Sequence, residues 1–492
     1  MDEREDRIAK ANALREAGME PYPARSHRDH TAGEVVERFD ELQGRSLTLA
    51  GRIMQLNEMG KAAFVRIEDG SARIQLYFKR DTLGPEAFGH IKKLDIGDFI
   101  EATGTLFRTR TGEKTLHVER FHVLAKALLP LPAKGVGGDL KLRDPEVRHR
   151  KRYLDLIANR DERMPVFLAR SRALTAMRAF LDSRGFIEVE TPILQPLYGG
   201  ATARPFITHH NALNRDFYLR IAPELYLKRL IVGGFEQVYE IARNFRNEGI
   251  DHTHNNEFTM MECYQAYADY EDMMRLVEEM YSSIVKTVTG STTITYQGRR
   301  IDMSPPWGRV TLREAIAEHT GIDYEEFPDR AALAAEMERK GFHVDPRLAR
   351  GRLIDDLKDV IIKGPGAKLT GPVFLYDYPL DLSPLAKLKP GTTNTVERFQ
   401  AYAGGLELGN AFTELNDPLD QRARFEDQAR QRAGGDEEAQ QLDEDFIEAL
   451  ETGMPPTGGF GGGIDRLVML LTDQDNIREV ILFPAMRPPQ DD

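Results

Sequence analysis

The sequence of 492 residues predicts an α+β protein with a small β-barrel near its N-terminus and a long α+β unit after it. Between Ser46 and about Leu128, short alternating stretches are separated by turns, which is typical of a small barrel. A proline- and glycine-rich segment follows at 129–138. Beyond it, apolar residues recur at helical spacing in several segments, at 161–183, 223–233, 270–287, 311–318, 330–340 and 418–433.

These patterns divide the chain into four expected regions. Residues 1–45 have helical spacing with a break near Pro21 and Pro23 and are expected to form an N-terminal helical extension. The barrel occupies 46–128, a linker covers 129–148, and the second domain spans 149–492. A chain of this length is too long for one ordinary core, which agrees with more than one domain.

Composition and charge exclude several classes of protein. The chain is 41% apolar and 29% charged with a mean hydropathy of −0.46, and it contains no apolar run long enough to span a membrane. The first residues do not resemble a signal peptide, and the single cysteine, Cys263, excludes an internal disulfide and a cysteine-based zinc site. We therefore expect a cytoplasmic protein. The net charge of −13 does not exclude a nucleic-acid partner, because residues 51–130 hold 13 Lys and Arg against 10 Asp and Glu.

Alternation along the predicted barrel strands separates an inner set of apolar residues from an outer set. The stretches 47–53, 64–68 and 73–78 direct their aliphatic positions inward. The outer face then gathers Arg52, Phe64, Arg66, Gln75 and Tyr77. Exposed rings stack on unpaired bases, arginine meets phosphate and glutamine reads a base edge, so this face suits RNA. Alternatively, Phe64 and Tyr77 pack against the N-terminal helices or the second domain.

The most informative stretch of the chain lies at 240–264 and reads as two strands joined by a polar loop. Period-two alternation places an arginine, several carboxylates and an aromatic ring on one sheet face, namely Glu240, Ala242, Asn244, Arg246 and Glu248 on the first strand with Phe258, Met260, Glu262 and Tyr264 on the second. Cys263 points to the other face and is expected to be a buried packing residue. The polar face favours binding of an amino acid, a nucleotide and a metal ion together.

These residues lie within motifs that resemble the class II lysyl-tRNA synthetases over almost the whole chain. Gly199–Leu213 and Ile221–Leu230 look like signature segments of that family, and the three class II motifs follow in order at 185–192, 245–248 and 461–466. The resemblance implies an N-terminal OB-fold barrel and a catalytic domain built on an antiparallel β-sheet flanked by helices. Residues 311–365 would be a helical insertion between motifs 2 and 3.

The same resemblance implies a reaction and its partners. L-lysine would be activated by ATP, with Mg²⁺ as cofactor, to lysyl-adenylate and then ligated to the 3′ end of tRNA(Lys). The anticodon of the tRNA would contact the barrel at Arg52, Phe64 and Gln75. Motif 1 would form a homodimer interface; its helix carries Phe167, Leu174, Met177 and Leu181 on one stripe, which also suits an intramolecular core.

By resemblance, the ATP site is formed by Arg246, Glu248, His254, Asn255, Phe258 and Arg466, with Arg246 and Arg466 as the catalytic residues. Arg246 would pair with the α-phosphate and with the lysine carboxylate, because a guanidinium fork matches planar oxyanions. Phe258 would lie under the adenine and Arg466 over it. No side chain in the motifs is an obvious general base, so positioning and electrostatics should carry most of the catalysis.

The implied lysine site is formed by Gly200, Glu224, Glu262, Tyr264, Asn410, Phe412 and Glu414. Glu224 and the backbone of Gly200 would meet the α-ammonium, and Glu414 with Tyr264 would meet the ε-ammonium. Glu262 and Glu414 would repel aspartate, which favours lysine over the substrates of aspartyl and asparaginyl relatives. No Lys or Arg adjoins either carboxylate in the sequence, so we expect the ligand rather than a tertiary partner to neutralise them.

Two features of the segment 400–414 need a separate explanation. Straight alternation puts Asn410, Phe412 and Glu414 on one face and Glu407 on the other. The family places all four in the site, so we predict a bulge or kink near Gly409. Family members usually have a second magnesium-binding glutamate where this chain has Gln400. Glutamine can offer only a neutral oxygen, so we expect Glu407 to bind Mg²⁺ and one metal site to be weakened.

Two alternatives to this function remain. One is an aspartyl- or asparaginyl-tRNA synthetase, which Glu262 and Glu414 disfavour. The other is a paralogue that lysylates a protein, or an RNA-binding protein without catalysis. The barrel argues against the paralogue, and a role in binding alone leaves Arg246, Glu407 and Arg466 without a purpose.

Overall fold

The computed structural model describes residues 2–132, 141–363, 370–433 and 441–488, and within these the chain divides into two compact units. The first comprises Met1–Arg143 with Ile157–Asn159, and the second comprises Asp144–Leu156 with Arg160–Asp492. Part of the predicted linker, 133–140, lies outside the described residues, as does the end of the predicted insertion. The finer division at residues 45, 128 and 148 stays a prediction.

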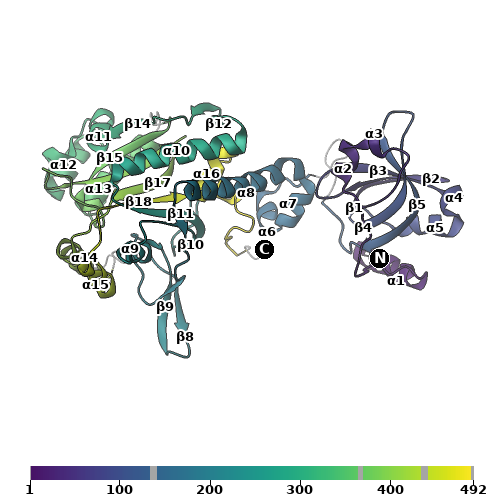
Figure 1. Cartoon of the computed structure of the whole chain (residues 1–492), viewed down its shortest axis with the longest axis horizontal. Coiled ribbons are helices and arrows are strands. Elements are labelled where there is room, and N and C mark those ends of the chain that lie inside the picture. The colour runs from purple at the N-terminus through teal and green to yellow at the C-terminus, as the bar shows by residue number, and fades with distance from the viewer. Residues whose placement is uncertain (1, 133–140, 364–369, 434–440, 489–492) are drawn as a thin grey trace. The chain divides into compact units, whose positions relative to one another are not determined.

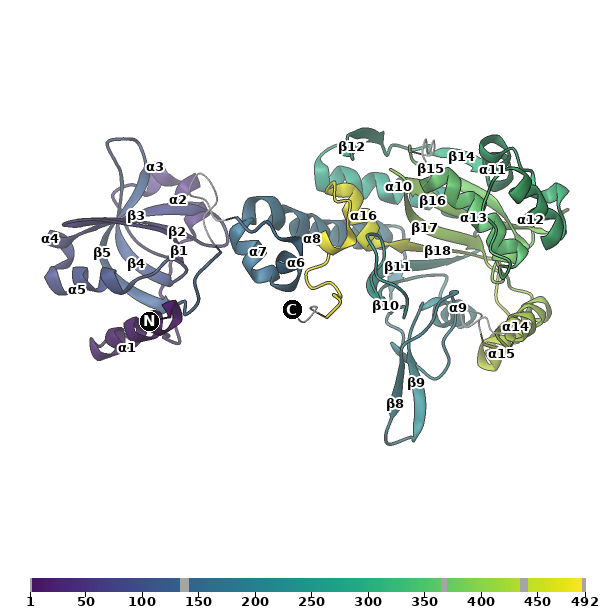
Figure 2. The same ribbon diagram turned by 180° about the vertical axis from the view of Figure 1, so that it is seen from behind.

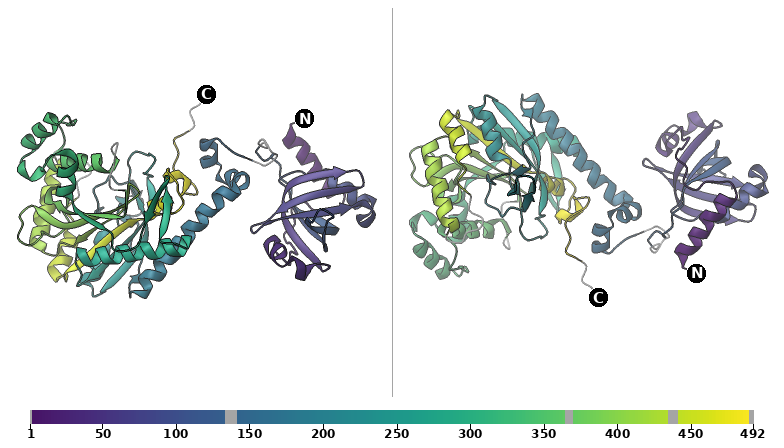
Figure 3. Two further views of the ribbon diagram at one scale, coloured as in Figure 1. Left: turned by 90° about the horizontal axis from the view of Figure 1, so that it is seen from above. Right: turned by 90° about the horizontal axis from the view of Figure 1, so that it is seen from below.

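The first unit is a closed barrel of five strands in the order β1-β2-β3-β5-β4, in which β1 also pairs with β4 (Figures 1 and 3). Its strands are β1 (Ser46–Met59), β2 (Ala62–Glu68), β3 (Arg73–Lys79), β4 (Phe99–Arg108) and β5 (Lys114–Ala125). The inward side chains form its apolar core, as predicted; Ile53, Val65 and Leu76 are fully buried. Short helices precede β1 and connect β3 to β4, namely α1 (Glu3–Glu16), α2 (Ala32–Glu37), α3 (Phe39–Leu42), α4 (Arg80–Leu83), α5 (Pro85–Gly89) and η1 (His90–Lys93).

The second unit is built on an eight-stranded sheet in the order β14-β15-β16-β17-β18-β11-β10-β6. The strands are β6 (Ile187–Glu188), β10 (Gln237–Phe245), β11 (Glu257–Ala266), β14 (Gly308–Thr311), β15 (Val373–Pro379), β16 (Thr395–Ala403), β17 (Leu406–Thr413) and β18 (Thr457–Gly463). The central pairs are antiparallel, as predicted, and only the two edge pairs, β14 with β15 and β6 with β10, are parallel.

Three helices pack on one face of this sheet (Figures 1 and 2). They are α8 (Arg160–Ser183), α10 (Tyr270–Thr289) and α16 (Ile464–Leu471). Apolar residues of these helices share one core with alternate residues of the strands, such as Tyr239, Met261 and Phe460. Because neighbouring residues on a strand point to opposite faces, the residues between them point into the pocket.

Smaller elements complete the second unit. Helix α9 (Glu224–Val232) contacts β10 and β11, and α14 (Pro418–Ala433) and α15 (Glu444–Thr452) lie beside it (Figure 1). The predicted insertion contains α11 (Leu312–Thr320), η2 (Tyr324–Glu326), α12 (Arg330–Arg339) and α13 (Arg350–Lys363), which share an apolar core with residues of β15 and β16. The remaining elements are α6 (Pro145–Arg150), α7 (Arg152–Ala158), β7 (Leu194–Gln195), β8 (Ile207–His210), β9 (Arg215–Leu219), β12 (Thr293–Tyr296), β13 (Arg299–Asp302), η3 (Leu380–Leu382) and η4 (Ile477–Glu479).

In the parts of the chain that the structure describes, none of the helices combines the length and the apolar character needed to cross a membrane.

Candidate functional site

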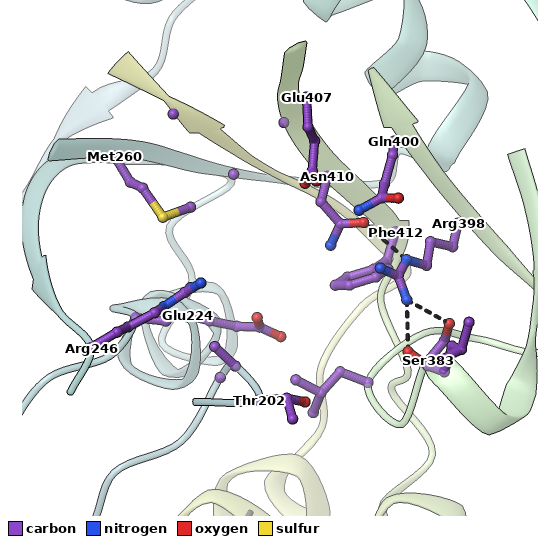
Figure 4. Close-up of a pocket in the computed structure, with 18 of the residues that line it drawn as sticks. Thr202, Glu224, Arg246, Met260, Ser383, Arg398, Gln400, Glu407, Asn410 and Phe412 are labelled. Carbon is purple, nitrogen blue, oxygen red and sulfur yellow. Dashed lines mark hydrogen bonds between the residues drawn. The ribbon is translucent and has the colours of Figure 1, made fainter. Parts of the chain in front are cut away.

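A cavity of about 1070 Å³ lies in the second unit, between the exposed face of the sheet and helix α9 (Figure 4). Strands β11, β16, β17 and β18 contribute to its lining, together with residues of α9, α13 and α14. This volume is at the upper end of the range for small-molecule sites and is large enough for two ligands side by side.

Strand register explains how one face collects the polar residues. In the pair β10 and β11, Glu240 lies opposite Glu262 and Asn244 lies opposite Phe258. The intervening residues Met261 and Cys263 belong to the core on the other face. Cys263 is fully buried, as predicted.

Every residue that the sequence assigned to ATP, lysine or metal lines this one cavity. They come from segments more than 200 residues apart in the sequence, namely Gly200, Glu224, Arg246, Glu248, His254, Asn255, Phe258, Glu262, Tyr264, Gln400, Glu407, Asn410, Phe412, Glu414 and Arg466.

Arg246 follows directly after β10 and carries a guanidinium without a protein anion. Its backbone N–H donates to the carbonyl of Asn256 at 2.9 Å, and its guanidinium carbon lies 5.1 Å from the centre of the Phe258 ring. Its Nε is buried without a hydrogen-bond partner, and within the described residues the guanidinium forms no ion pair. Burial lowers the pKa of Arg246. A buried, unpaired guanidinium is suited to an anionic ligand.

Arg466 lies at the same end of the cavity, on the first turn of α16. Its Nη2 lies 3.1 Å from Nε2 of His254, and its Nη1 lies 3.8 Å from a carboxylate oxygen of Glu407. The neighbouring Asp465 accepts the backbone N–H of Thr259 at 2.8 Å and pairs with Arg170 of α8 at 2.6 Å. Asp465 therefore ties α16 to β11 and α8; sequence alternation did not single it out because it acts through contacts distant in sequence.

Three buried carboxylates lie near one another in the cavity. Glu224, Glu262 and Glu414 are each at most 5% exposed, and the hydroxyl of Tyr264 donates to Glu262 at 3.1 Å. Burial, reinforced by the charge of Glu224, raises the pKa of Glu262 to about 8. Burial and the same carboxylates raise the pKa of Tyr264 well above its ordinary value, so its phenol remains a hydrogen-bond donor.

Two glycines allow these carboxylates to approach. A Cβ atom on Gly459 would lie 2.0 Å from Oε1 of Glu414 and 2.6 Å from the Tyr264 ring. Gly200 has a φ of +84°, and a Cβ there would lie 2.9 Å from Cβ of Glu224. Larger residues at either position would displace a carboxylate of the pocket.

The expectation that the ligand rather than a tertiary partner neutralises Glu262 and Glu414 was wrong for Glu414. Lys228, one helical turn after Glu224 on α9, places its ammonium 2.6 Å from Glu224 and in direct contact with Glu414. The i,i+4 spacing of Glu224 and Lys228 was a usable signal in the sequence. The contact with Glu414 was not, because 186 residues separate the two along the chain.

The bulge predicted near Gly409 is present. On β16, Ala401 lies opposite Gly409 and the next residue, Tyr402, lies opposite Glu407, so Leu408 is an additional residue on β17. The bulge turns Glu407 to the face that carries Gln400 and Asn410, and all three border the cavity (Figure 4).

Gln400 has the carbonyl oxygen of its amide already engaged. Oε1 accepts hydrogen bonds from the hydroxyls of Tyr378 at 2.6 Å and Tyr402 at 2.9 Å, which uses both of its lone pairs. Two positions earlier on β16, Arg398 donates to Asn410 at 2.9 Å and to Ser383 at 3.0 Å (Figure 4). Arg398 was not singled out in the sequence, although it shares the face of Gln400.

A second, shallower cavity of about 470 Å³ lies on the outer face of the barrel and is lined by Gln55, Asn57, Met59, Phe64, Arg66, Gln75, Thr109, Thr111 and Glu113. The Phe64 ring lies 5.0 Å from that of Tyr77, which contacts Phe107 and His117 of the same barrel. Arg52 is not in this groove. Its guanidinium donates to the carbonyl of Gly97 at 3.0 Å and lies over the Phe99 ring.

The apolar stripe on the motif 1 helix, α8, mostly faces inward. Met177 and Leu181 are fully buried in the core of their own unit, and Leu174 packs against it. The exposed apolar residues of this region lie elsewhere, at Leu168, Ile187, Ile193 and Leu194. The stripe therefore does not by itself indicate a dimer interface.

Comparison with known proteins agrees with both units. Residues 144–487 match the family model "tRNA synthetases class II (D, K and N)", and residues 47–124 match the model "OB-fold nucleic acid binding domain". The chain is 56% identical over 490 residues to a protein of Chloroflexus aurantiacus named lysine–tRNA ligase, covering 99% of this chain and 98% of that protein. It is 56% identical to the protein of the same name from Roseiflexus castenholzii, with 98% of each covered, and 50% identical to that of Moorella thermoacetica, with 99% and 98% covered. The chain therefore belongs to the class II tRNA synthetases of the D, K and N group, with an OB-fold domain at its N-terminal end.

Proposed function

We propose that this chain is a lysine–tRNA ligase, which activates L-lysine with ATP and transfers it to the 3′ end of tRNA(Lys). The observation that carries this proposal is the combination of acidic and basic side chains in the cavity. Buried carboxylates and the guanidinium of Arg246, which forms no ion pair among the described residues, border the same cavity, which matches an amino acid with a cationic side chain and a reacting carboxylate. The names of the relatives support the same substrate.

The first step would be attack of the lysine carboxylate on the α-phosphorus of ATP, with pyrophosphate leaving. Arg246 would hold the carboxylate and the α-phosphate together and stabilise the charge that builds on the phosphorus. Phe258 would support the adenine, with His254, Glu248, Asn255 and Arg466 around the nucleotide. In the second step the ribose 3′-hydroxyl of tRNA would attack the carbonyl of lysyl-adenylate, forming the ester while the bond to the phosphate breaks; AMP leaves and its phosphate can take up the hydroxyl proton.

At the lysine end, Glu224 and the backbone of Gly200 would bind the α-ammonium, and Glu414 and Tyr264 the ε-ammonium. Asn410 and Phe412 would line the aliphatic stem. Aspartate and asparagine offer no cation to Glu262 and Glu414, so the same residues that bind lysine would exclude these substrates.

Glu407 fits a magnesium ion that accompanies ATP, whereas Gln400 does not fit as an oxygen ligand. The Glu407 carboxylate borders the cavity and its contact with Arg466 is long, at 3.8 Å, while both lone pairs of the Gln400 oxygen are taken by tyrosines. Among the described residues, no three His, Cys, Asp or Glu side chains gather as a metal site, which agrees with an ion held mainly by the phosphates. Bound magnesium would neutralise phosphate charge and so ease the loss of pyrophosphate.

The remaining partners follow from this function. Phe64 and Gln75 share the groove on the barrel and would contact the anticodon. Arg52, whose guanidinium lies over the Phe99 ring outside this groove, would meet the RNA backbone. A homodimer would cover the exposed Leu168, Ile187 and Leu194 around the edge strand β6. A cytoplasmic location is proposed because charged tRNA is consumed there.

The proposed substrate is tested by charging a transcript of tRNA(Lys) with each amino acid in a panel, in the presence of ATP and Mg²⁺. We expect aminoacyl-tRNA with lysine and none with aspartate or asparagine. Charging by either of the latter two would overturn the proposal. Formation of lysyl-adenylate without charged tRNA would instead support a different acceptor.

Replacement of Arg246 by lysine should slow lysine-dependent ATP–pyrophosphate exchange by about 10²–10³-fold, because a point charge cannot replace the bidentate fork at the developing charge. The matched control is Arg243→Lys. Arg243 lies three residues earlier in the chain, is exposed, and pairs with Glu257 at 3.6 Å. An exchange rate for Arg246→Lys equal to that of Arg243→Lys would contradict the assigned role.

Lysine binding should release a proton from Glu262 and strengthen as the pH rises. The pKa of Glu262 in the empty pocket is about 8, and a nearby ammonium favours the ionised form. The dissociation constant for lysine should therefore fall by about tenfold per pH unit up to about pH 8 and then level off. Calorimetric titration at several pH values measures this slope, and Glu262→Gln should abolish it. A slope of equal size in Glu262→Gln would rule out Glu262 as the source.

Replacement of Gln400 by glutamate should lower the Mg²⁺ concentration that half-saturates ATP–pyrophosphate exchange, because one carboxylate oxygen can still accept from the tyrosines while the added charge faces the cavity. The control Tyr402→Phe frees a lone pair on Gln400 without adding charge and should leave the midpoint nearly unchanged. If Gln400→Glu leaves the Mg²⁺ dependence unchanged, the hypothesis of a weakened metal site fails.

A further inference from the structure

Lys228 is a buried cation that none of the roles assigned above uses. Its side chain is fully buried on α9, and it is not among the residues that line the cavity. The ammonium lies 2.6 Å from Oε1 of Glu224 and contacts Oε2 of Glu414 directly. Burial alone would lower the pKa of Lys228, but the two carboxylates outweigh it and hold that pKa above its ordinary value.

The two carboxylates that Lys228 joins are presented by separate elements. Glu224 is the first residue of α9, whereas Glu414 follows directly after β17. The backbone N–H of Glu414 donates to the carbonyl of Thr457 at 2.8 Å, but neither carboxylate oxygen has a hydrogen-bond partner within the described residues apart from its contact with Lys228. Lys228 is thus the contact that links the positions of the two carboxylates.

Among Glu224, Glu262, Glu414, Arg246 and bound lysine, formal charges balance only when Lys228 is included. With lysine bound, its own carboxylate joins Glu224, Glu262 and Glu414 as the fourth negative charge. The two ammonium groups of the ligand, Arg246 and Lys228 supply four positive charges. In the empty pocket, protonated Glu262 leaves Glu224 and Glu414 against Arg246 and Lys228, which again balances. Uncompensated buried charge is costly, so both states depend on Lys228.

We infer that Lys228 is a positioning residue that fixes the separation between the carboxylates of Glu224 and Glu414, and thereby sets the length of the diamino acid that the pocket accepts. This inference rests on the proposed activation of lysine, because it assigns one carboxylate to each ammonium group. Two of the three N–H bonds of the Lys228 ammonium suffice for the two carboxylates, which keep other lone pairs for the ligand.

The test compares lysine with ornithine, which is one methylene shorter, in ATP–pyrophosphate exchange by the full-length protein. In Lys228→Met the aliphatic stem remains while the link is lost. We expect the KM for lysine to rise more than kcat falls, the KM for ATP to stay constant, and the preference for lysine over ornithine in kcat/KM to shrink by about tenfold. A reduced kcat with an unchanged lysine-to-ornithine preference would indicate a merely structural role and overturn the inference.

Lys126 in the barrel offers a matched control. Its side chain is also fully buried, and its ammonium contacts Asp95 and lies 2.7 Å from Asp98. Lys126→Met removes an equivalent buried cation outside the pocket and should leave the preference for lysine over ornithine unchanged. If Lys126→Met shrinks that preference as Lys228→Met does, loss of stability explains both and the inference fails.

A double variant keeps the inference testable if Lys228→Met does not fold. Lys228→Met combined with Glu414→Gln removes both members of the contact, so less uncompensated charge is buried. If Lys228 acts through Glu414, the double variant should show the same lysine-to-ornithine preference as Glu414→Gln alone. A further loss of preference in the double variant would overturn the inference. Wild-type protein that fails to activate lysine would instead overturn the proposed function itself.

Discussion

Three carboxylates buried at one end of a single cavity impose the constraint on which the rest of this pocket depends. Each of Glu224, Glu262 and Glu414 loses hydration on burial, and a buried carboxylate without a cation or a proton is costly. The protein meets this constraint in two ways. Lys228 contacts both Glu224 and Glu414, and burial raises the pKa of Glu262 to about 8, so that Glu262 holds a proton more readily than an exposed carboxyl group does. The empty pocket therefore buries little uncompensated charge, and binding of a cationic ligand would favour the ionised form of Glu262.

The eight-stranded sheet separates the polar cavity on one face from the apolar core on the other. One face of the strands shares its core with α8, α10 and α16, and the other carries the polar residues of the cavity. Asp465 joins the two sides, since its carboxylate accepts from the backbone of β11 while pairing with Arg170 of α8. Arg466 follows Asp465 on α16. The helix that packs in the core therefore also holds the guanidinium of Arg466 beside the proposed nucleotide site.

The sequence predicted much of this arrangement because alternation along strands is a local property. The shared face of Asn244, Phe258 and Glu262 follows from a period of two, and so do the inner and outer sets of the barrel. The resemblance to a known family supplied the roles of the residues and the bulge at Leu408. Such local patterns could not predict contacts between elements that are distant in the sequence. Lys228 meets Glu414 only after α9 and β17 are brought together, and the side chain of Arg52 turns toward Phe99 instead of toward the groove. The motif 1 stripe was ambiguous because an apolar helix face has the same pattern whether its partner is the same chain or another.

The extra residue at Leu408 separates the two ends of strand β17 from one another. Glu407 on its N-terminal side and Asn410, Phe412 and Glu414 on its C-terminal side all border the cavity. We propose that the former serves the nucleotide and the latter three the amino acid. An insertion or deletion in a regular strand inverts every side chain beyond it, whereas a bulge can absorb such a change locally. A change of length in the segment proposed to bind the amino acid could therefore leave the orientation of Glu407 unchanged. The extra residue thus divides β17 into two segments, and a change in the segment proposed to bind the amino acid need not disturb the segment proposed to serve ATP.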